Sequence, residues 1–552
     1  MARTPLAAAA VLLLLGCQHP HIEQSLTGAK LFDGLDGYHR PIDTSSEAAQ
    51  RWFDQGLQLA YGFNHAEAIR SFREAAALDP DSPMPWWGIA YSTGMNINDP
   101  VMTEERWRAA WQAAQEAQQR AGSTTSAVET ALVEAVVARY TWPPPAQQRT
   151  LDEAYAAAME RAWKAHPGDP DVGALYAESL MDLQPWDYWT NEGAPKRRIE
   201  EIIEVLETVQ AAHPDHPGAA HFYIHAVEAA HPEKAEAAAD RLAHLVPGAG
   251  HVVHMPSHIY VRVGRYADAA DINTRAVATD RAYFETAPEP DLYWIYFAHN
   301  LHFLAYASMM EARYDSAIRA ARELERDLPP QVVEKYGGLI EGIMATTFHV
   351  QVRFGRWEDI LAEPPRPDYR LVTRAVRHYA RGIAYAATGR TEEARSEVAA
   401  FESAAAAIPG DWWVFNNKVD TVLPIARAML EGEVAFREGQ HGSAFASLRR
   451  AIAAEDALVY DEPPAWMLPV RHSLGALLMA AGHFEEAEAV YREDLERNSG
   501  NGWSILGLRE ALAAQGRAVE AMEVGSLLAG AWRRTDVTAT SSCFCAPGPV
   551  AE

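Results

Sequence analysis

Residues 52–80 read WFDQGLQLAYGFNHAEAIRSFREAAALDP, and this stretch decides the fold. Its small, aromatic and proline residues recur at spacings that suit a helical hairpin: Trp52, Gly56, Ala68, Phe72, Ala75 and Pro80. Small residues let two helices cross closely, aromatic side chains fill the space beside them, and a proline stops the second helix. The stretch therefore predicts two antiparallel helices joined by a short turn.

The same signature recurs along the chain. A glycine precedes a small or apolar residue by five positions in six places: Gly264 and Ala269, Gly355 and Ile360, Gly389 and Ala394, Gly439 and Ala444, Gly482 and Ala487, Gly516 and Ala521. Ala235 and Ala317 fill the same slot without the glycine. Two successive glycine pairs are 34 residues apart, which is the period of tetratricopeptide repeats, and the chain resembles that family. These registers predict an all-α, tetratricopeptide-type solenoid of stacked helical hairpins.

The predicted organisation follows from where the repeats can be phased. The segments are a signal peptide at 1–17, an irregular segment at 18–45, N-terminal repeats at 46–120, helical but poorly phased repeats at 121–212, histidine-rich repeats at 213–365, C-terminal repeats at 366–535 and an irregular tail at 536–552.

Tetratricopeptide arrays bind ligands on their concave face, so the resemblance implies that a protein or peptide partner binds there.

The N-terminus carries a secretion signal. Arg3 precedes an uncharged apolar run that ends in Leu15-Gly16-Cys17, and this ending resembles the lipobox of bacterial lipoproteins. The resemblance implies that Cys17 is lipidated and anchors the protein at the cell envelope, on the periplasmic face or in the outer membrane. A plain secretory signal followed by an incidental cysteine is the alternative. No later segment is apolar for the roughly 18 residues that a membrane span needs.

Composition and motif searches narrow the function. The net charge of −27 argues against a nucleic-acid partner, because negative charge repels phosphate. The sequence has no glycine-rich phosphate loop, flavin signature, HExxH or GxSxG motif. Glu178 and Asp182 form a carboxylate pair one helical turn apart, which we expect to be exposed. Cys543 and Cys545 are one residue apart, so they can chelate a soft metal or close a small disulfide.

Histidine is concentrated in one region, because residues 213–258 hold nine of the 21 histidines. We aligned the repeats on the small or apolar residue that follows the turn glycine. In this alignment, histidines of three adjacent repeats fall at repeat positions 2, 5 and 9, which lie in the first helix. In the tetratricopeptide family, side chains at these positions face the groove. An earlier pair, His221 and His225, is spaced one turn apart. The candidate metal ligands are therefore His221, His225, His251, His254, His258, His299, His302 and His349.

Several imidazoles from neighbouring helices suit a transition metal, with zinc and copper ahead of iron and nickel. Ligating histidines need acceptors behind them, and Glu228 or Asn300 can serve. Pro256 lies inside this region and should start or kink a helix. The alternative is a non-enzymatic scaffold in which the same histidines are only hydrogen-bonded and the groove holds a peptide.

Three blocks give this region a second resemblance. The blocks are HPGAAHFYIHAVE (216–228), HMPSHIYVRVGRY (254–266) and HNLHFLAYASMMEARY (299–314), and they resemble those of a widespread group of bacterial tetratricopeptide proteins. The resemblance implies a shared site and names no reaction.

Overall fold

The computed structural model describes residues 29–286 and 292–546, and it divides into two compact units. Unit 1 runs through Ile259 and takes in Arg275–Tyr293, whereas unit 2 takes in Tyr260–Thr274 and continues from Trp294. Cys17 lies outside the described residues. The described chain contains no helix that is both long and apolar enough to cross a membrane.

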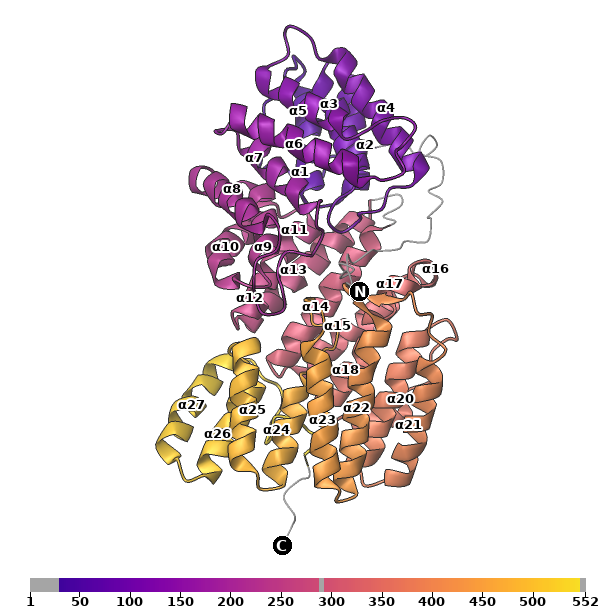
Figure 1. The fold of residues 1–552 in the computed structure, drawn as a ribbon, viewed down its shortest axis with the longest axis vertical. Helices are drawn as coiled ribbons and strands as arrows, with labels where there is room; N and C mark the ends of the chain where they lie inside the picture. The colour runs from indigo at the N-terminus through magenta and orange to yellow at the C-terminus, as the bar shows by residue number, and fades with distance from the viewer. Residues whose placement is uncertain (1–28, 287–291, 547–552) are drawn as a thin grey trace, which may run out of the picture. The chain divides into compact units, whose positions relative to one another are not determined.

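Unit 1 is a stack of helices (Figure 1). α12 (Pro256–Arg262) and α13 (Tyr266–Phe284) each give residues to both units. The other elements are α1 (Glu47–Tyr61), α2 (His65–Leu78), α3 (Pro83–Thr93), α4 (Glu104–Arg120), α5 (Ala127–Ala138), α6 (Arg149–Ala165), α7 (Pro170–Met181), α8 (Ile199–Ala212), α9 (Pro217–Val227), η1 (Pro232–Ala235), α10 (Glu236–Leu245) and α11 (Gly250–His254).

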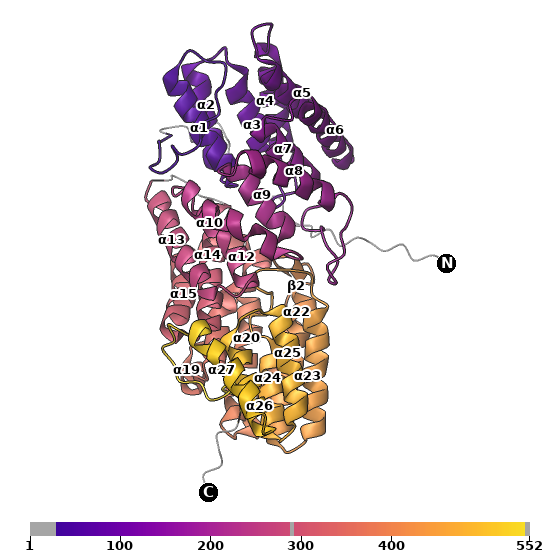
Figure 2. The ribbon, with the colours of Figure 1, turned by 90° about the vertical axis from the view of Figure 1, so that its left-hand side faces the viewer.

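Unit 2 continues the pattern, and Figures 1 and 2 show its later helices side by side. The two-residue strands β1 (Trp413–Val414) and β2 (Asn417–Lys418) form an antiparallel pair before α22. The helices are α14 (Tyr293–Met310), α15 (Tyr314–Asp327), α16 (Pro330–Lys335), α17 (Gly337–Ile340), η2 (Ile343–Ala345), α18 (Thr346–Arg353), α19 (Trp357–Ala362), α20 (Leu371–Ala387), α21 (Thr391–Ala405), α22 (Val419–Arg437), α23 (His441–Asp456), α24 (Val470–Ala480), α25 (Phe484–Arg497), α26 (Gly502–Ala514) and α27 (Ala518–Ala531).

The packing inside the hairpins confirms the predicted all-α repeat fold. The ring of Phe72 lies between Gly56 and Gly88, where a Cβ on either glycine would come within 2.7 Å of it. Glycine is therefore required on both sides of the ring, because the helices could not approach so closely around a side chain. Tyr491 lies in the same way between Gly475 and Gly507, so a second repeat in unit 2 uses the same arrangement.

The turns between paired helices explain the recurring glycines. Gly355 and Gly389 have φ values of 62° and 78°, in the left-handed region that glycine adopts without strain. The alanine-slot residues that follow are buried, as Ala394 and Ala444 show. Each glycine thus ends one helix, and the small residue after it lets the next helix pack against its partner.

The irregular ends of the described chain are packed against the helices. Near the N-terminus, the Gln55 side chain accepts a hydrogen bond from the Phe32 amide at 2.7 Å and donates to the Lys30 carbonyl at 2.8 Å. Near the C-terminus, Cys543 and Cys545 are buried and form a disulfide, which is one of the two arrangements that their spacing allows.

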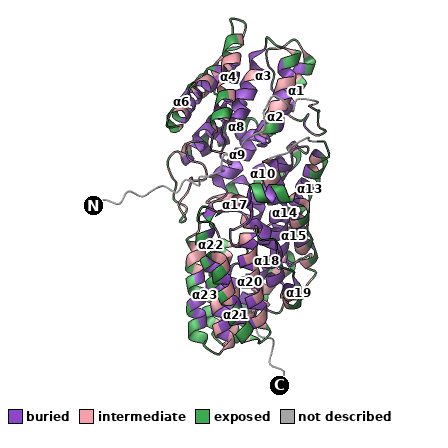
Figure 3. Cartoon of the chain, turned by 90° about the vertical axis from the view of Figure 1, so that its right-hand side faces the viewer, coloured by how far each residue is buried: buried purple, intermediate pink, exposed green. Residues whose placement is uncertain are grey.

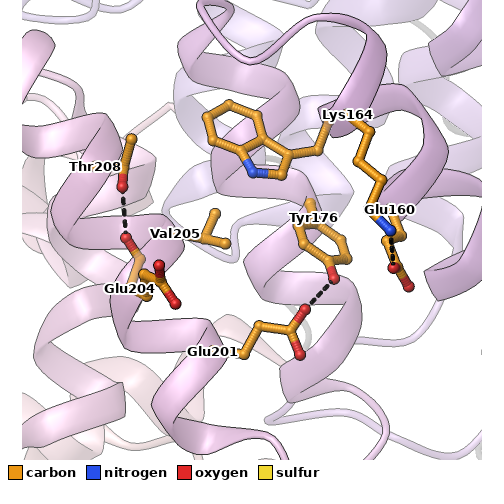
Figure 4. Close-up of a pocket in the computed structure, with 8 residues that line it drawn as sticks. Glu160, Lys164, Tyr176, Glu201, Glu204, Val205 and Thr208 are labelled. Atoms are coloured by element: carbon orange, nitrogen blue, oxygen red, sulfur yellow. Dashed lines mark hydrogen bonds and ion pairs between the residues drawn. The ribbon is translucent and has the colours of Figure 1, made fainter.

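Unit 1 also has a small surface pocket of about 250 Å³ beside α6, α7 and α8 (Figure 4). Two of its acidic side chains are already engaged: the Tyr176 hydroxyl donates to Glu201 at 2.6 Å, and the Lys164 ammonium donates to Glu160 at 2.5 Å. None of the candidate metal ligands lines this pocket.

Candidate metal centre

Two of the candidate histidines share one face of a fully buried helix. α9 begins at Pro217, and the His216 side chain caps it by accepting a hydrogen bond from the Ala219 amide at 3.0 Å. Every residue of α9 is buried, and Figure 3 shows the helix coloured accordingly. His221 and His225 are four residues apart, so their imidazoles project to the same side.

A backbone carbonyl fixes the orientation of His221. Its Nδ1 lies 2.6 Å from the carbonyl oxygen of Tyr61, and since a carbonyl can only accept, Nδ1 carries the proton. The other ring nitrogen, Nε2, therefore holds a lone pair. Nε2 is buried and has no hydrogen-bond partner among the described residues. Burial, and then the neighbouring His225, hold the pKa of His221 well below its usual value, so the ring is neutral.

A carboxylate fixes His225 in the same way. Its Nδ1 lies 3.1 Å from Oε1 of Glu228, the residue that caps the C-terminus of α9. Its Nε2 is also buried and makes no hydrogen bond within the described chain. The ring of Trp186 meets His225 edge-on at 5.0 Å between centroids and covers it.

The third imidazole comes from α11. The ring centroid of His251 lies 5.1 Å from that of His221, and the three buried histidines each offer one nitrogen within 4.8 Å of the others. Two nitrogens bonded to one metal at about 2.1 Å can be no more than about 4.2 Å apart. Small rotations of the rings would therefore bring His221, His225 and His251 into the bonding range of a single ion.

Phe63 closes the site with an apolar ring. It stacks on His225 and His251 with centroid distances of 6.4 and 5.8 Å. Phe63 has a φ of 56°, which costs a residue with a Cβ roughly 1–2 kcal/mol. Most repeats of unit 2 have glycine at this turn position, for example Gly389 with a φ of 78°, although Ala312 adopts a φ of 57° at the same position. Backbone strain held at a cluster of polar side chains is typical of functional sites.

Glu228 connects this cluster to two further histidines. Its second oxygen lies 2.9 Å from Nδ1 of His258, and Nε2 of His258 lies 2.9 Å from Nε2 of His254. Burial alone would raise the pKa of Glu228, but His258 and His225 beside it hold that pKa well below its usual value. The carboxylate therefore accepts a hydrogen bond from Nδ1 of His225 and lies against Nδ1 of His258, while the Nε2 atoms of His254 and His258 share a hydrogen bond.

The break between α11 and α12 allows this arrangement. The sequence predicts an interruption at Pro256, and the structure shows α11 ending at His254 and α12 beginning at Pro256. Ser257 Oγ lies 3.3 Å from Nδ1 of His254 and donates to the His254 carbonyl at 2.7 Å.

The remaining candidates belong to unit 2. His302 and Asn300 are buried on α14, His299 is half-buried on the same helix, and His349 is buried on α18. Burial lowers the pKa of both His302 and His349 to about 3, and His349 contributes to the shift of His302. That the histidines of unit 1 and unit 2 share one site stays a prediction.

One expectation about unit 1 is wrong. Glu178 and Asp182 are buried, whereas their helical spacing alone favoured an exposed pair. The reason is tertiary: Arg139, at the end of α5, donates to Asp182 at 2.5 Å and lies over the ring of Tyr155. Sequence reasoning also missed Tyr61 and Phe63, because their roles at the histidines arise from packing between repeats.

Comparisons with known proteins add little to this geometry. No family model matches the chain, and no curated protein matches it. Among solved structures, it is similar to the human IFIT1 dimer with m7Gppp-AAAA, at a TM-score of 0.33 and 14% identity over 89% of this chain and 91% of that one. The human IFIT1 dimer with PPP-AAAA gives a TM-score of 0.33 and 15% identity over 87% and 90% of the two chains. At this level of similarity we draw nothing about ligands.

Proposed function

We propose that unit 1 binds one transition-metal ion, zinc or copper, through His221, His225 and His251. A single observation carries the proposal. His221 and His225 are each held at Nδ1 by an acceptor, their buried Nε2 atoms make no hydrogen bond among the described residues, and each of the two rings has a nitrogen within 4.8 Å of one on His251. A ligating histidine usually donates its other N–H to a carbonyl or carboxylate in this way.

The surroundings suit an ion with imidazole ligands. Neutral imidazoles bind zinc and copper well. Glu228, which is hydrogen-bonded to the ligand His225, supplies a negative charge that offsets part of the free-energy cost of burying the ion. Phe63 and Trp186 form the apolar shell that limits access of water. Three protein ligands leave one position of a tetrahedral ion open to water or a substrate, as in catalytic zinc sites.

One observation favours the alternative of a non-enzymatic scaffold. His254 and His258 hydrogen-bond directly to each other, so part of the histidine network is satisfied without an ion. In that case the cluster stabilises the stacked helices, and the ligand of the protein is a peptide or another protein.

Metal analysis separates the two functions. Tag-free protein prepared without chelator should contain close to one equivalent of zinc or copper, and His225→Asn should remove it. His244→Ala is the matched control, since His244 is exposed on α10 of the same unit. A wild-type protein that contains no metal and takes up none on titration supports the scaffold instead.

We further propose that the protein is a lipoprotein anchored through Cys17. The apolar run before Leu15-Gly16-Cys17 supports this proposal. Cys17→Ser should leave the precursor unprocessed or release the protein from the membrane fraction. Normal processing together with unchanged fractionation would contradict the proposal.

A further inference from the structure

The chain after α27 returns to unit 2 and contacts several of its helices. Residues 536–546, here called the tail, contain no helix or strand. The carboxylate of Asp536 accepts hydrogen bonds from the backbone amides of Tyr314 and Asp315 at 2.6 and 3.0 Å. These amides lie at the N-terminus of α15, which favours a negative charge. The first anchor of the tail is therefore an acidic side chain on a helix N-terminus.

The second anchor is the backbone around Ser542. Its hydroxyl donates to the His472 carbonyl of α24 at 2.8 Å. Its own carbonyl accepts a hydrogen bond from Arg353 at the end of α18, and Arg437 of α22 donates to the Cys545 carbonyl. Side chains that bind backbone carbonyls give affinity for a peptide without reading its sequence.

The side chain of Phe544 adds specificity to these backbone contacts. Its ring meets that of Trp503 on α26 edge-on at 6.2 Å between centroids. A Cβ added to Gly355, in the turn after α18, would come within 2.7 Å of the Phe544 Cβ. A Cβ added to Gly389, at the same turn position of the next repeat, would meet no atom within 4 Å. The glycine at 355 therefore makes room for the tail as well as for the turn.

The tail can leave its anchors without the unfolding of a helix. It contains none, and Thr538 and Thr540 between the two anchors are exposed, so little packing is lost there. Its departure would deprive the buried Arg353 guanidinium of a carbonyl acceptor, and an unpaired buried donor is unfavourable. Another peptide that supplies a carbonyl at the same place would restore this hydrogen bond.

We propose that this surface of unit 2 is a peptide-binding site and that the tail is its intramolecular ligand, which occupies the site until another peptide displaces it. The partner that fits is a segment of another protein with an acidic residue for the N-terminus of α15 and an aromatic residue eight positions later, as Asp536 and Phe544 are spaced. The proposal does not depend on the metal centre of unit 1.

Hydrogen exchange of the full-length protein, followed by mass spectrometry, tests whether the tail detaches by itself. Gly355→Ala should speed amide exchange in residues 536–546 and leave α24 and α25 protected, because the added methyl group displaces Phe544. Gly389→Ala is the matched control, since it strains a turn with the same φ sign and does not touch the tail. Unchanged tail exchange in Gly355→Ala would overturn the proposal. Loss of protection in α24 and α25 together with the tail would also overturn it, because the tail would then belong to the core.

Fluorescence anisotropy with a labelled synthetic peptide of residues 536–546, in its disulfide form, tests binding at the site. Phe544→Ala weakens the attached tail and leaves the surface of the helices unchanged. This variant should bind the peptide about tenfold more tightly than the wild type, in which the attached tail competes at a high effective concentration. Adding Gly355→Ala to Phe544→Ala should remove the gain, whereas adding Gly389→Ala should keep it. Equal affinity of wild type and Phe544→Ala, or no binding to either, contradicts the proposal.

Discussion

Replacement of Asp494 by Asn should destabilise unit 2 in a way that depends on pH. Asp494 is buried on α25 and joins three helices. One of its oxygens is 2.9 Å from Nε2 of His472 and accepts hydrogen bonds from Asn501 at 3.0 Å and Ser504 at 2.6 Å. The other accepts from Asn498 at 3.0 Å. An Asn side chain keeps the shape but loses the charge that these donors require.

The magnitude follows from the pKa. Burial alone would raise the pKa of Asp494, but His472 and the other donors lower it from 3.8 to about 2. That difference corresponds to about 2.5 kcal/mol of stability at neutral pH. Because the folded-state pKa is below the unfolded value, this stability is present above pH 3.8 and is lost as the pH falls toward 2. Breaking a buried charged network by removing one member costs about 3–5 kcal/mol, so we expect a loss of about 3 kcal/mol at pH 7.

Urea unfolding followed by tryptophan fluorescence measures this effect. The difference between wild type and Asp494→Asn should narrow by about 1 kcal/mol between pH 4.5 and pH 3, because the Asp494 carboxyl binds a proton in the unfolded wild type over this range while it stays ionised in the folded protein. Glu496→Gln is the control, since Glu496 is exposed on the same helix and its replacement should change stability by less than about 0.5 kcal/mol. A variant within about 1 kcal/mol of the wild type at pH 7, or a difference that does not change with pH, would refute the reasoning.

Three further changes test the packing, each by urea unfolding. Phe72→Ala should cost about 3–5 kcal/mol, because the ring fills the space between two glycines; a loss close to that of the half-exposed Leu78→Ala would contradict this packing. Arg139→Ala should cost about 3–5 kcal/mol, since it leaves the buried Asp182 carboxyl unpaired, and a neutral effect would count against the buried pair. Gly389→Ala should cost about 1 kcal/mol from its φ of 78° alone, because a Cβ there meets no atom within 4 Å; a gain in stability would be inconsistent with that backbone.

The repeat fold could be predicted because its signals are local. Gly389 followed by Ala394 specifies a turn and a close helix contact within a few residues, and the structure shows both. Even at 121–212, where the repeats were hard to phase, the composition predicted helices, and the structure has α5 to α8 in this range. The burial of Asp182 could not be predicted in this way, because Arg139 lies 43 positions away and no periodic pattern links the two.

The candidate site could be predicted only in outline. Repeat positions and helical spacing identified the histidines, and the need for an acceptor identified Glu228, which contacts His225 and His258. The contact that orients His221 could not be found, because Tyr61 lies 160 positions away and meets it only through tertiary packing.

The most direct test of the central claim is the metal content of tag-free wild-type protein beside His221→Asn, measured by inductively coupled plasma mass spectrometry. Nε2 of His221 is the proposed ligand atom, and Nδ1 of the same ring donates a hydrogen bond to the Tyr61 carbonyl. An Asn side chain is too short to keep this hydrogen bond and bind the metal at the same time. We expect the wild type to hold one zinc or copper ion in unit 1, His221→Asn to lack it, and His244→Ala to retain it. Equal metal content in wild type and His221→Asn, or none in either after titration, would exclude a metal centre at these histidines.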